Sequence, residues 1–93
     1  MIAKLNRRLY DYLIYNLSKE HEFLRSKLLA KKEDQFIYVK VNSDIADEIR
    51  DWAMDKQIKI GFDLNYKLNA EGKILEELID IFYLPPPPDA MEP

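Results

Sequence analysis

Residues 58–69, IKIGFDLNYKLN, alternate apolar and polar side chains without interruption. In an extended chain, successive side chains point to opposite faces, so this pattern is typical of a half-buried β-strand. One face of such a strand would carry Ile58, Ile60, Phe62, Leu64, Tyr66 and Leu68. We therefore predict a strand over residues 58–68, and this assignment decides the fold predicted for the rest of the chain.

The flanking segments predict a β-α-β unit that ends in a further helix. Residues 36–41, FIYVKV, are β-branched and aromatic at alternating positions and predict a first strand. Ser43 is a typical helix cap, and apolar residues recur at helical spacing to about Gln57. A helix between two strands returns the chain to its starting edge, so we expect the strands to pair in parallel. A last helix over residues 73–84 is stopped by four consecutive prolines.

The N-terminal region predicts a long helix over residues 2–32, because apolar residues recur there in steps of three and four. Unbroken, it would measure about 45 Å, longer than a compact globule of this size, about 30 Å across. Two alternatives remain open: the helix breaks at Ser18 and folds back as a hairpin, or its overhang packs on another subunit. The near-heptad seam expected to mediate self-association comprises Tyr10, Ile14, Leu17, Leu24 and Leu28.

The predicted fold class is therefore α+β, with a long, hinged or unbroken N-terminal helix, a small β-α-β unit and a C-terminal helix. We expect one domain over residues 1–84, with a helical region at 1–32, a core at 36–84 and a disordered proline-rich tail at 85–93. Because two strands alone are too few for a stable sheet, a homodimer is expected.

The composition offers little for catalysis or for metal binding. The 93 residues include no Cys and a single histidine, His21, so neither a disulfide nor a zinc cluster is expected. Two glycines cannot build a phosphate-binding loop or a dinucleotide fingerprint. We expect no catalytic residues, no metal site, no cofactor and no enzymatic activity.

Charge is unevenly distributed along the chain. Residues 1–32 hold eight basic and three acidic residues, whereas residues 33–93 hold six basic and fourteen acidic ones. The basic residues that could bind an anion are Lys4, Arg7, Arg8, Lys27, Lys31 and Lys32. An acidic stripe along the helix after Ser43, a candidate surface for a protein partner, comprises Asp44, Asp47, Glu48, Asp51 and Asp55.

Three functions follow from these patterns. The first is a small non-catalytic accessory or inhibitory protein that associates with itself and with an unidentified protein, of the kind expected from a microbe, virus or mobile element. The second is an acidic nucleic-acid mimic that occupies a nucleic-acid-binding protein, since the stripe presents a row of negative charges like a phosphate backbone. The third is RNA or DNA binding through the basic N-terminal helix, where tyrosines are interleaved with basic residues.

Residues 37–53, IYVKVNSDIADEIRDWA, resemble the opening of a ribbon–helix–helix repressor. The resemblance implies that the outward strand residues Tyr38 and Lys40 would read the major groove. That family requires a second helix after a turn near residue 57, where this chain has its clearest strand pattern. We therefore favour the strand over the repressor fold.

The segment LPPPPD, residues 84–89, resembles the ligand motif of EVH1 domains, which bind polyproline II helices in aromatic grooves. The alternative is a helix stop followed by a solubilising tail. No apolar run approaches the roughly 20 residues of a membrane span. Asp11 interrupts the N-terminal apolar run, and no cleavage site for a signal peptide follows it. We expect a cytoplasmic protein.

Overall fold

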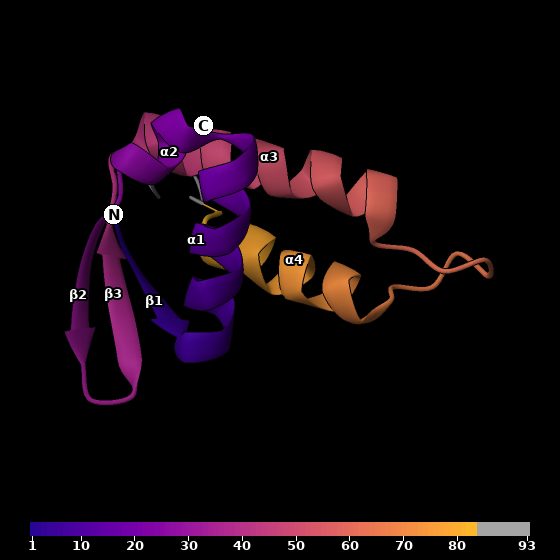
Figure 1. Ribbon diagram of the computed structural model, residues 1–93, viewed down its shortest axis with the longest axis horizontal. Helices are drawn as coiled ribbons and strands as arrows, with labels where there is room; N and C mark the ends of the chain where they lie inside the picture. The colour runs from indigo at the N-terminus through magenta and orange to yellow at the C-terminus, as the bar shows by residue number, and fades with distance from the viewer. Residues whose placement is uncertain (84–93) are drawn as a thin grey trace, which may run out of the picture.

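The computed structural model describes residues 1–83, and these form a mixed α+β fold, which confirms the predicted class (Figure 1). The predicted tail and the proline motif lie outside the described residues. In chain order the elements are β1 (Ile2–Asn6), α1 (Arg7–Glu20), α2 (Glu22–Ser26), β2 (Leu29–Glu33), β3 (Phe36–Lys40), α3 (Ser43–Ile60) and α4 (Ala70–Ile81).

The three strands form one antiparallel sheet in the order β1-β3-β2. In β1, Ala3 lies opposite Val39 and Leu5 opposite Ile37 of β3. The predicted parallel β-α-β unit is therefore wrong, although its first strand is confirmed as β3. The partners of β3 come from the N-terminal region, on both of its edges, and not from residues 58–68.

The prediction of a helix over residues 2–32 is wrong at both of its ends. Residues 2–6 form β1, in which Ala3 and Leu5 are buried and their neighbours are not. Asn6 then caps α1 by accepting a hydrogen bond from the Leu9 amide at 2.8 Å. The helical region breaks at His21, whose backbone dihedral angles (φ −155°, ψ 70°) are not helical, and not at Ser18.

The strand β2 reads LAKKE and is solvent-exposed along its whole length. It forms a hairpin with β3 through a turn in which Asp34 adopts a positive φ of 55°. Asp tolerates this left-handed conformation better than most residues. Only pairing with β3 makes this segment a strand, since Ala, Lys and Glu are all poor strand formers.

The predicted strand over residues 58–68 is also wrong. Residues 58–60 complete α3, and the chain then loops into α4, which begins at Ala70. Asparagines cap both helices: Asn42 accepts from the Ile45 amide at 2.8 Å, and Asn69 accepts from the Gly72 amide at 2.7 Å. A cap was expected at Ser43, one residue late, and the second cap was not expected at all.

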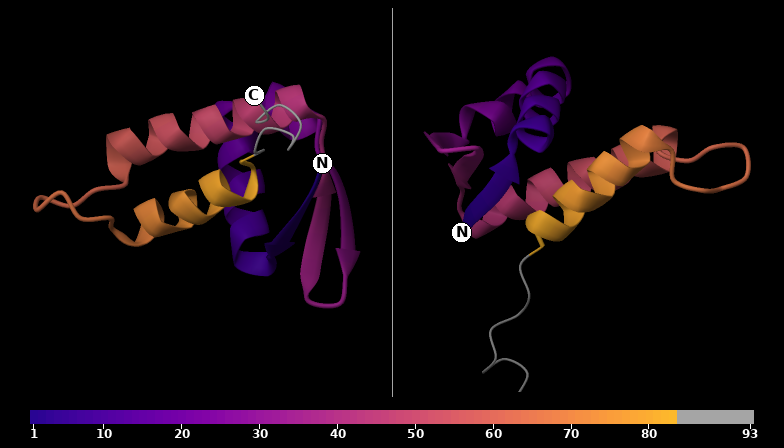
Figure 2. Two further views of the ribbon diagram at one scale, coloured as in Figure 1. Left: turned by 180° about the vertical axis from the view of Figure 1, so that it is seen from behind. Right: turned by 90° about the horizontal axis from the view of Figure 1, so that it is seen from below.

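The two glycines of the sequence face each other where α3 ends and α4 begins. A Cβ atom on Gly72 would overlap the Gly61 carbonyl oxygen, and one on Gly61 would lie 3.0 Å from the Gly72 Cα. The Asn69 amide closes the same junction by donating to the Gly61 carbonyl at 2.9 Å. The absence of side chains at both positions therefore allows the two helices to lie side by side as an antiparallel pair (Figure 2).

The core lies where α1 packs against one face of the sheet and against the helical pair. Its fully buried side chains include Leu5, Leu13, Leu17, Ile49 and Phe82. At the edge of this core, Tyr12 on α1 donates to Glu71 on α4 at 2.5 Å. Burial, together with this bond to the Glu71 carboxylate, raises the pKa of Tyr12, so its hydroxyl remains a donor over the whole working pH range.

The β2–β3 hairpin and the loop between α3 and α4 project from opposite ends of the molecule (Figures 1 and 2). None of the helices formed by residues 1–83 has the length and apolar character needed to cross a membrane.

The contact between the two glycines predicts that a Gly→Ala substitution destabilises the fold, the opposite of the effect expected from helix propensity. In an ordinary helix, replacing Gly by Ala stabilises by about 1 kcal/mol. At Gly72 the added methyl group would overlap the Gly61 carbonyl, so we expect Gly72→Ala to lower the free energy of unfolding by about 1–3 kcal/mol. Urea unfolding followed by circular dichroism measures this difference, and an unchanged or higher stability would contradict the close approach.

Candidate functional site

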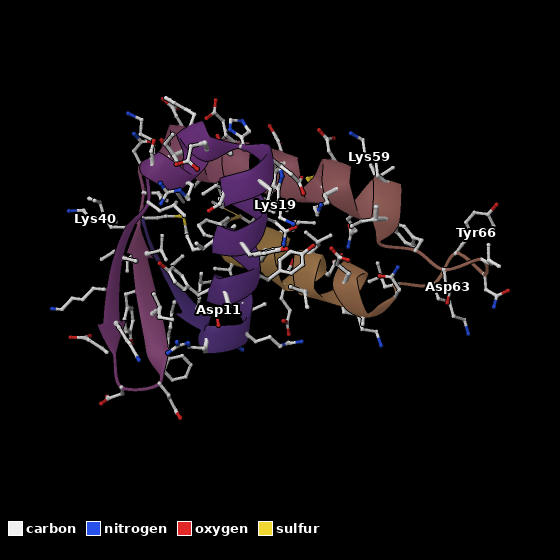
Figure 3. The ribbon with its side chains drawn as sticks, viewed as in Figure 1. Asp11, Lys19, Lys40, Lys59, Asp63 and Tyr66 are labelled. Carbon is white, nitrogen blue, oxygen red and sulfur yellow. The ribbon has the colours of Figure 1, made fainter. Side chains whose placement is uncertain are left out.

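Exposed apolar side chains gather at the tip of the α3–α4 pair. Among the described residues, eleven large hydrophobic side chains are exposed, and five of these lie between residues 58 and 66. Leu64 is 99 % exposed and Tyr66 is 88 % exposed. We call residues 61–69 the contact loop. Figure 3 shows Asp63 and Tyr66 at the far end of the molecule from Lys40.

The contact loop is held by its own hydrogen bonds. Phe62 and Leu68 form an antiparallel bridge, and the Asp63 amide donates to the Lys67 carbonyl at 2.8 Å. The Asp63 carboxylate accepts from the amides of Asn65 at 2.8 Å and Lys67 at 3.0 Å. This Asx-type arrangement fixes the backbone between them and leaves the Leu64 side chain in solvent.

Tyr66 adopts a φ of 62°, in the left-handed region that few residues other than Gly, Asn and Asp occupy. Its amide donates to the Asp63 carbonyl at 3.0 Å. A tyrosine in this conformation costs the fold on the order of 1 kcal/mol. Such local strain is concentrated at functional sites. The contact loop thus presents an aromatic side chain where an Asn would fit the backbone better.

The strand predicted over residues 58–68 would place the apolar residues of this loop on a buried face. The alternation in residues 58–68 exists, yet of its six apolar residues only Leu68 is half-buried, and the other five are exposed. Ile58 at 72 % and Phe62 at 43 % exposure continue the patch from the end of α3 into the loop.

A second candidate site is a groove of about 400 Å³ between the α1–α2 junction and α3. Glu20 lies across this groove, where it accepts from Trp52 Nε1 at 3.1 Å and from Lys56 Nζ at 2.5 Å. Partial burial acts to raise the pKa of Glu20, but the bonds from Lys56 and Trp52 outweigh it, and the pKa is lowered. The partners are 32 and 36 residues from Glu20, a separation that no local pattern reveals.

The five residues of the acidic stripe are all exposed along α3. Three of them, Glu48, Asp51 and Asp55, line the groove, while Asp47 lies 3.7 Å from Arg50. Lys56 and Lys59 line the same groove and interrupt the negative charge at the C-terminal half of the helix. The use of this stripe as a nucleic-acid mimic therefore stays a prediction. The interrupted row of negative charge does not strengthen it.

The residues predicted for self-association do not lie on a free surface. Leu17 and Leu24 are fully buried in the core of the single chain, and Tyr10 and Leu28 pack against that core. Ile14 is half-buried. A contact between two copies through this seam would require the core to open. Self-association remains a prediction, but any surface that mediates it must lie elsewhere.

The six basic residues were expected on one N-terminal helix, but the structure distributes them over several elements. Only Arg7 and Arg8 belong to α1, and they pair with Asp11 at 3.5 Å and Glu77 at 3.1 Å. Lys27 follows α2, with its Nζ 5.1 Å from the centre of the Phe23 ring. The remaining three, Lys4, Lys31 and Lys32, belong to the sheet.

His21 lies exposed at the edge of the groove, beside Glu20. Within residues 1–83, no group of three or more His, Cys, Asp or Glu side chains is placed to hold a metal ion.

Comparison with protein-family models, with curated proteins and with solved structures finds no match for this chain.

The Glu20 contacts generate a prediction for stability and its pH dependence. Because the folded-state pKa of Glu20 lies below its ordinary value of 4.5, its stabilisation is fully present above that value and is lost as the pH falls through the folded pKa. The pair with Lys56 is partly exposed, so Glu20→Gln should lower the free energy of unfolding at pH 7 by about 1 kcal/mol or less.

Thermal unfolding of the wild type and the variant between pH 3 and pH 7 measures this effect, and the difference between the two should shrink below about pH 4.5. Glu48→Gln is the matched control, since Glu48 lines the same groove but forms no ion pair among the described residues. Equal losses for both variants at pH 7 would contradict a specific role for Glu20.

Proposed function

We propose that this protein is a small, non-catalytic protein-interaction protein that self-associates through its contact loop. The observation that carries the proposal is the near-complete exposure of Leu64 and Tyr66 on a loop whose backbone is fixed by Asp63. Large apolar side chains in a contiguous exposed patch typically mark a surface that another protein covers.

The energy available from covering this loop is substantial for a small protein. Burial of a Leu side chain contributes about 1.5–3 kcal/mol, and a Tyr adds a large ring with a polar end. Tyr is also among the residues that carry most of the binding energy at protein interfaces. Because the loop is already ordered by its own hydrogen bonds, less conformational entropy is lost when it binds.

A second copy of the chain is the partner that the charges of the loop favour. Residues 61–69 contain one acidic residue, Asp63, and one basic residue, Lys67, so the loop carries no net charge. Two identical loops can therefore approach one another without repulsion in a two-fold contact, in which the same patch is used by both copies. The acidic face of α3 would repel its own copy.

The proposal predicts that loss of the two exposed side chains abolishes self-association. We expect the wild type to approach twice its monomer mass of 11.1 kDa as its concentration rises. The double variant Leu64→Ser, Tyr66→Asn should keep the monomer mass at the same concentrations. Asn accepts a positive φ, so this variant retains the loop backbone while losing the apolar surface. Light scattering on a sizing column, at low and at high salt, measures the mass.

The matched control is Tyr15→Ser, Phe23→Ser, which removes two aromatic residues that are 60 % and 56 % exposed on α1 and α2. This control should self-associate like the wild type. Because the contact is apolar, high salt should not dissociate it. A wild type that is monomeric at millimolar concentration, or a loop variant that associates like the wild type, would overturn the proposal.

A further inference from the structure

The face of the sheet that points away from α1 is a second candidate binding surface, separate from the contact loop. In β1 and β3 the buried residues alternate with the residues of this outer face, and the register of β2 with β3 places every second β2 residue on the same face. We call it the outer sheet face, and it consists of Ile2, Lys4 and Asn6 on β1, Phe36, Tyr38 and Lys40 on β3, and Leu29, Lys31 and Glu33 on β2. All nine side chains are exposed or half-buried.

The strand register places Tyr38 between two lysines. Lys4 of β1 and Lys31 of β2 are its direct cross-strand partners on either side. Neighbouring strands lie about 4.8 Å apart, so the backbones of the two lysines lie about 10 Å from one another across the sheet, with Tyr38 between them. Lys40, two residues further along β3, adds a third positive charge on the same face.

A shallow hollow of about 270 Å³ lies beside this row. It is lined by Ile2, Leu29, Ala30, Lys31, Tyr38 and Lys40. Ile2 is 65 % exposed and Leu29 is 67 % exposed, so the hollow joins an aromatic ring, apolar side chains and positive charge. The other ring of the face, Phe36, is covered by Lys4, whose Nζ lies 4.1 Å from the ring centre. Tyr38 is half-buried, and among the described residues no cation lies over its ring.

The outer sheet face is basic in a chain that is acidic overall. Three lysines stand against one carboxylate, Glu33, which lies 3.5 Å from Lys31 Nζ. Residues 43–81, by contrast, hold ten acidic and five basic residues. This segregation directs a polyanion to the sheet and away from α3 and α4.

We propose that the outer sheet face binds single-stranded nucleic acid, with a base stacked on Tyr38 and phosphates at Lys4, Lys31 and Lys40. Single strands are bound without sequence preference by an aromatic ring that stacks on a base within a basic surface that follows the backbone. An acidic peptide would match the lysines equally well, but its carboxylates offer no ring for Tyr38. The aromatic ring between the lysines therefore favours nucleobases over a protein ligand.

The test is fluorescence anisotropy of labelled 12-nucleotide single strands, oligo(dT) and oligo(rU), at 50 mM salt. Tyr38→Ala should weaken binding by about tenfold, whereas Tyr38→Phe, which keeps the ring, should bind like the wild type. If each lysine neutralises one phosphate, the logarithm of the affinity should fall with the logarithm of the salt concentration with a slope of about −2.

The triple variant Lys4→Gln, Lys31→Gln, Lys40→Gln should lose both the binding and its salt dependence. The charge-matched control Lys59→Gln, Lys67→Gln, Lys73→Gln removes three exposed lysines outside the sheet and should bind like the wild type. Circular dichroism verifies that each variant is folded. Because the triple lysine variant leaves the apolar side chains in place, the proposal stays testable if Tyr38→Ala does not fold.

A labelled twelve-residue glutamate peptide serves as the competing ligand. Equal affinity for the peptide and the oligonucleotides, with no loss in Tyr38→Ala, would overturn the proposal and assign the face to an acidic protein. Absence of binding to any single strand at 50 mM salt would also overturn it. The double variant of the contact loop should retain nucleic-acid binding, so failure of either proposal is recognised independently of the other.

Discussion

The pairing of β1 with β3 is the constraint on which the rest of the structure depends. It joins segments thirty or more residues apart. Met1 continues the pairing: its amino group donates to the Val41 carbonyl at 2.7 Å, and its carbonyl accepts from the Val41 amide at 3.1 Å. Because β1 leads directly into α1, this pairing fixes where α1 begins and lays it over the inner face of the sheet. Leu5, Ile37 and Val39 are thereby buried from the sheet side, and Leu9 and Leu13 from the helix side.

The elements predicted correctly are those whose signals are local. The strand at β3 follows from its alternating β-branched residues, and Ile37 and Val39 are indeed the buried ones. The helix α3 follows from its apolar spacing, which indicates a buried stripe of Ile45, Ile49, Trp52 and Ala53; all of these are buried except Trp52, which is half-buried. Leu75 and Leu78 of the last helix are likewise buried, as its pattern indicates.

The elements that were missed owe their conformation to distant partners. Leu5 fits both a step of four, which suits a helix, and a step of two, which suits a strand, and only β3 decides between them. The residues of β2 have no strand preference of their own. The alternation in residues 58–68 fails for a different reason. It predicts a buried face only where another surface covers that face, and within residues 1–83 five of the six apolar side chains are left exposed. The candidate sites were therefore less predictable than the fold, because a contact such as that between Glu20 and Trp52 joins two helices that no pattern relates.

The contact loop and the β2–β3 hairpin lie at opposite ends of the molecule (Figure 1). A two-fold assembly joined at the loops would carry its two sheets at its outer ends, facing away from the junction. Such an assembly is bivalent. Once one sheet has bound a nucleic-acid strand, the second sheet meets the same nucleic acid at a raised effective concentration. The overall avidity then exceeds the affinity of either face alone. The separation of the two sheets would then set a minimum length, since only nucleic-acid strands long enough to reach both sheets gain from both faces.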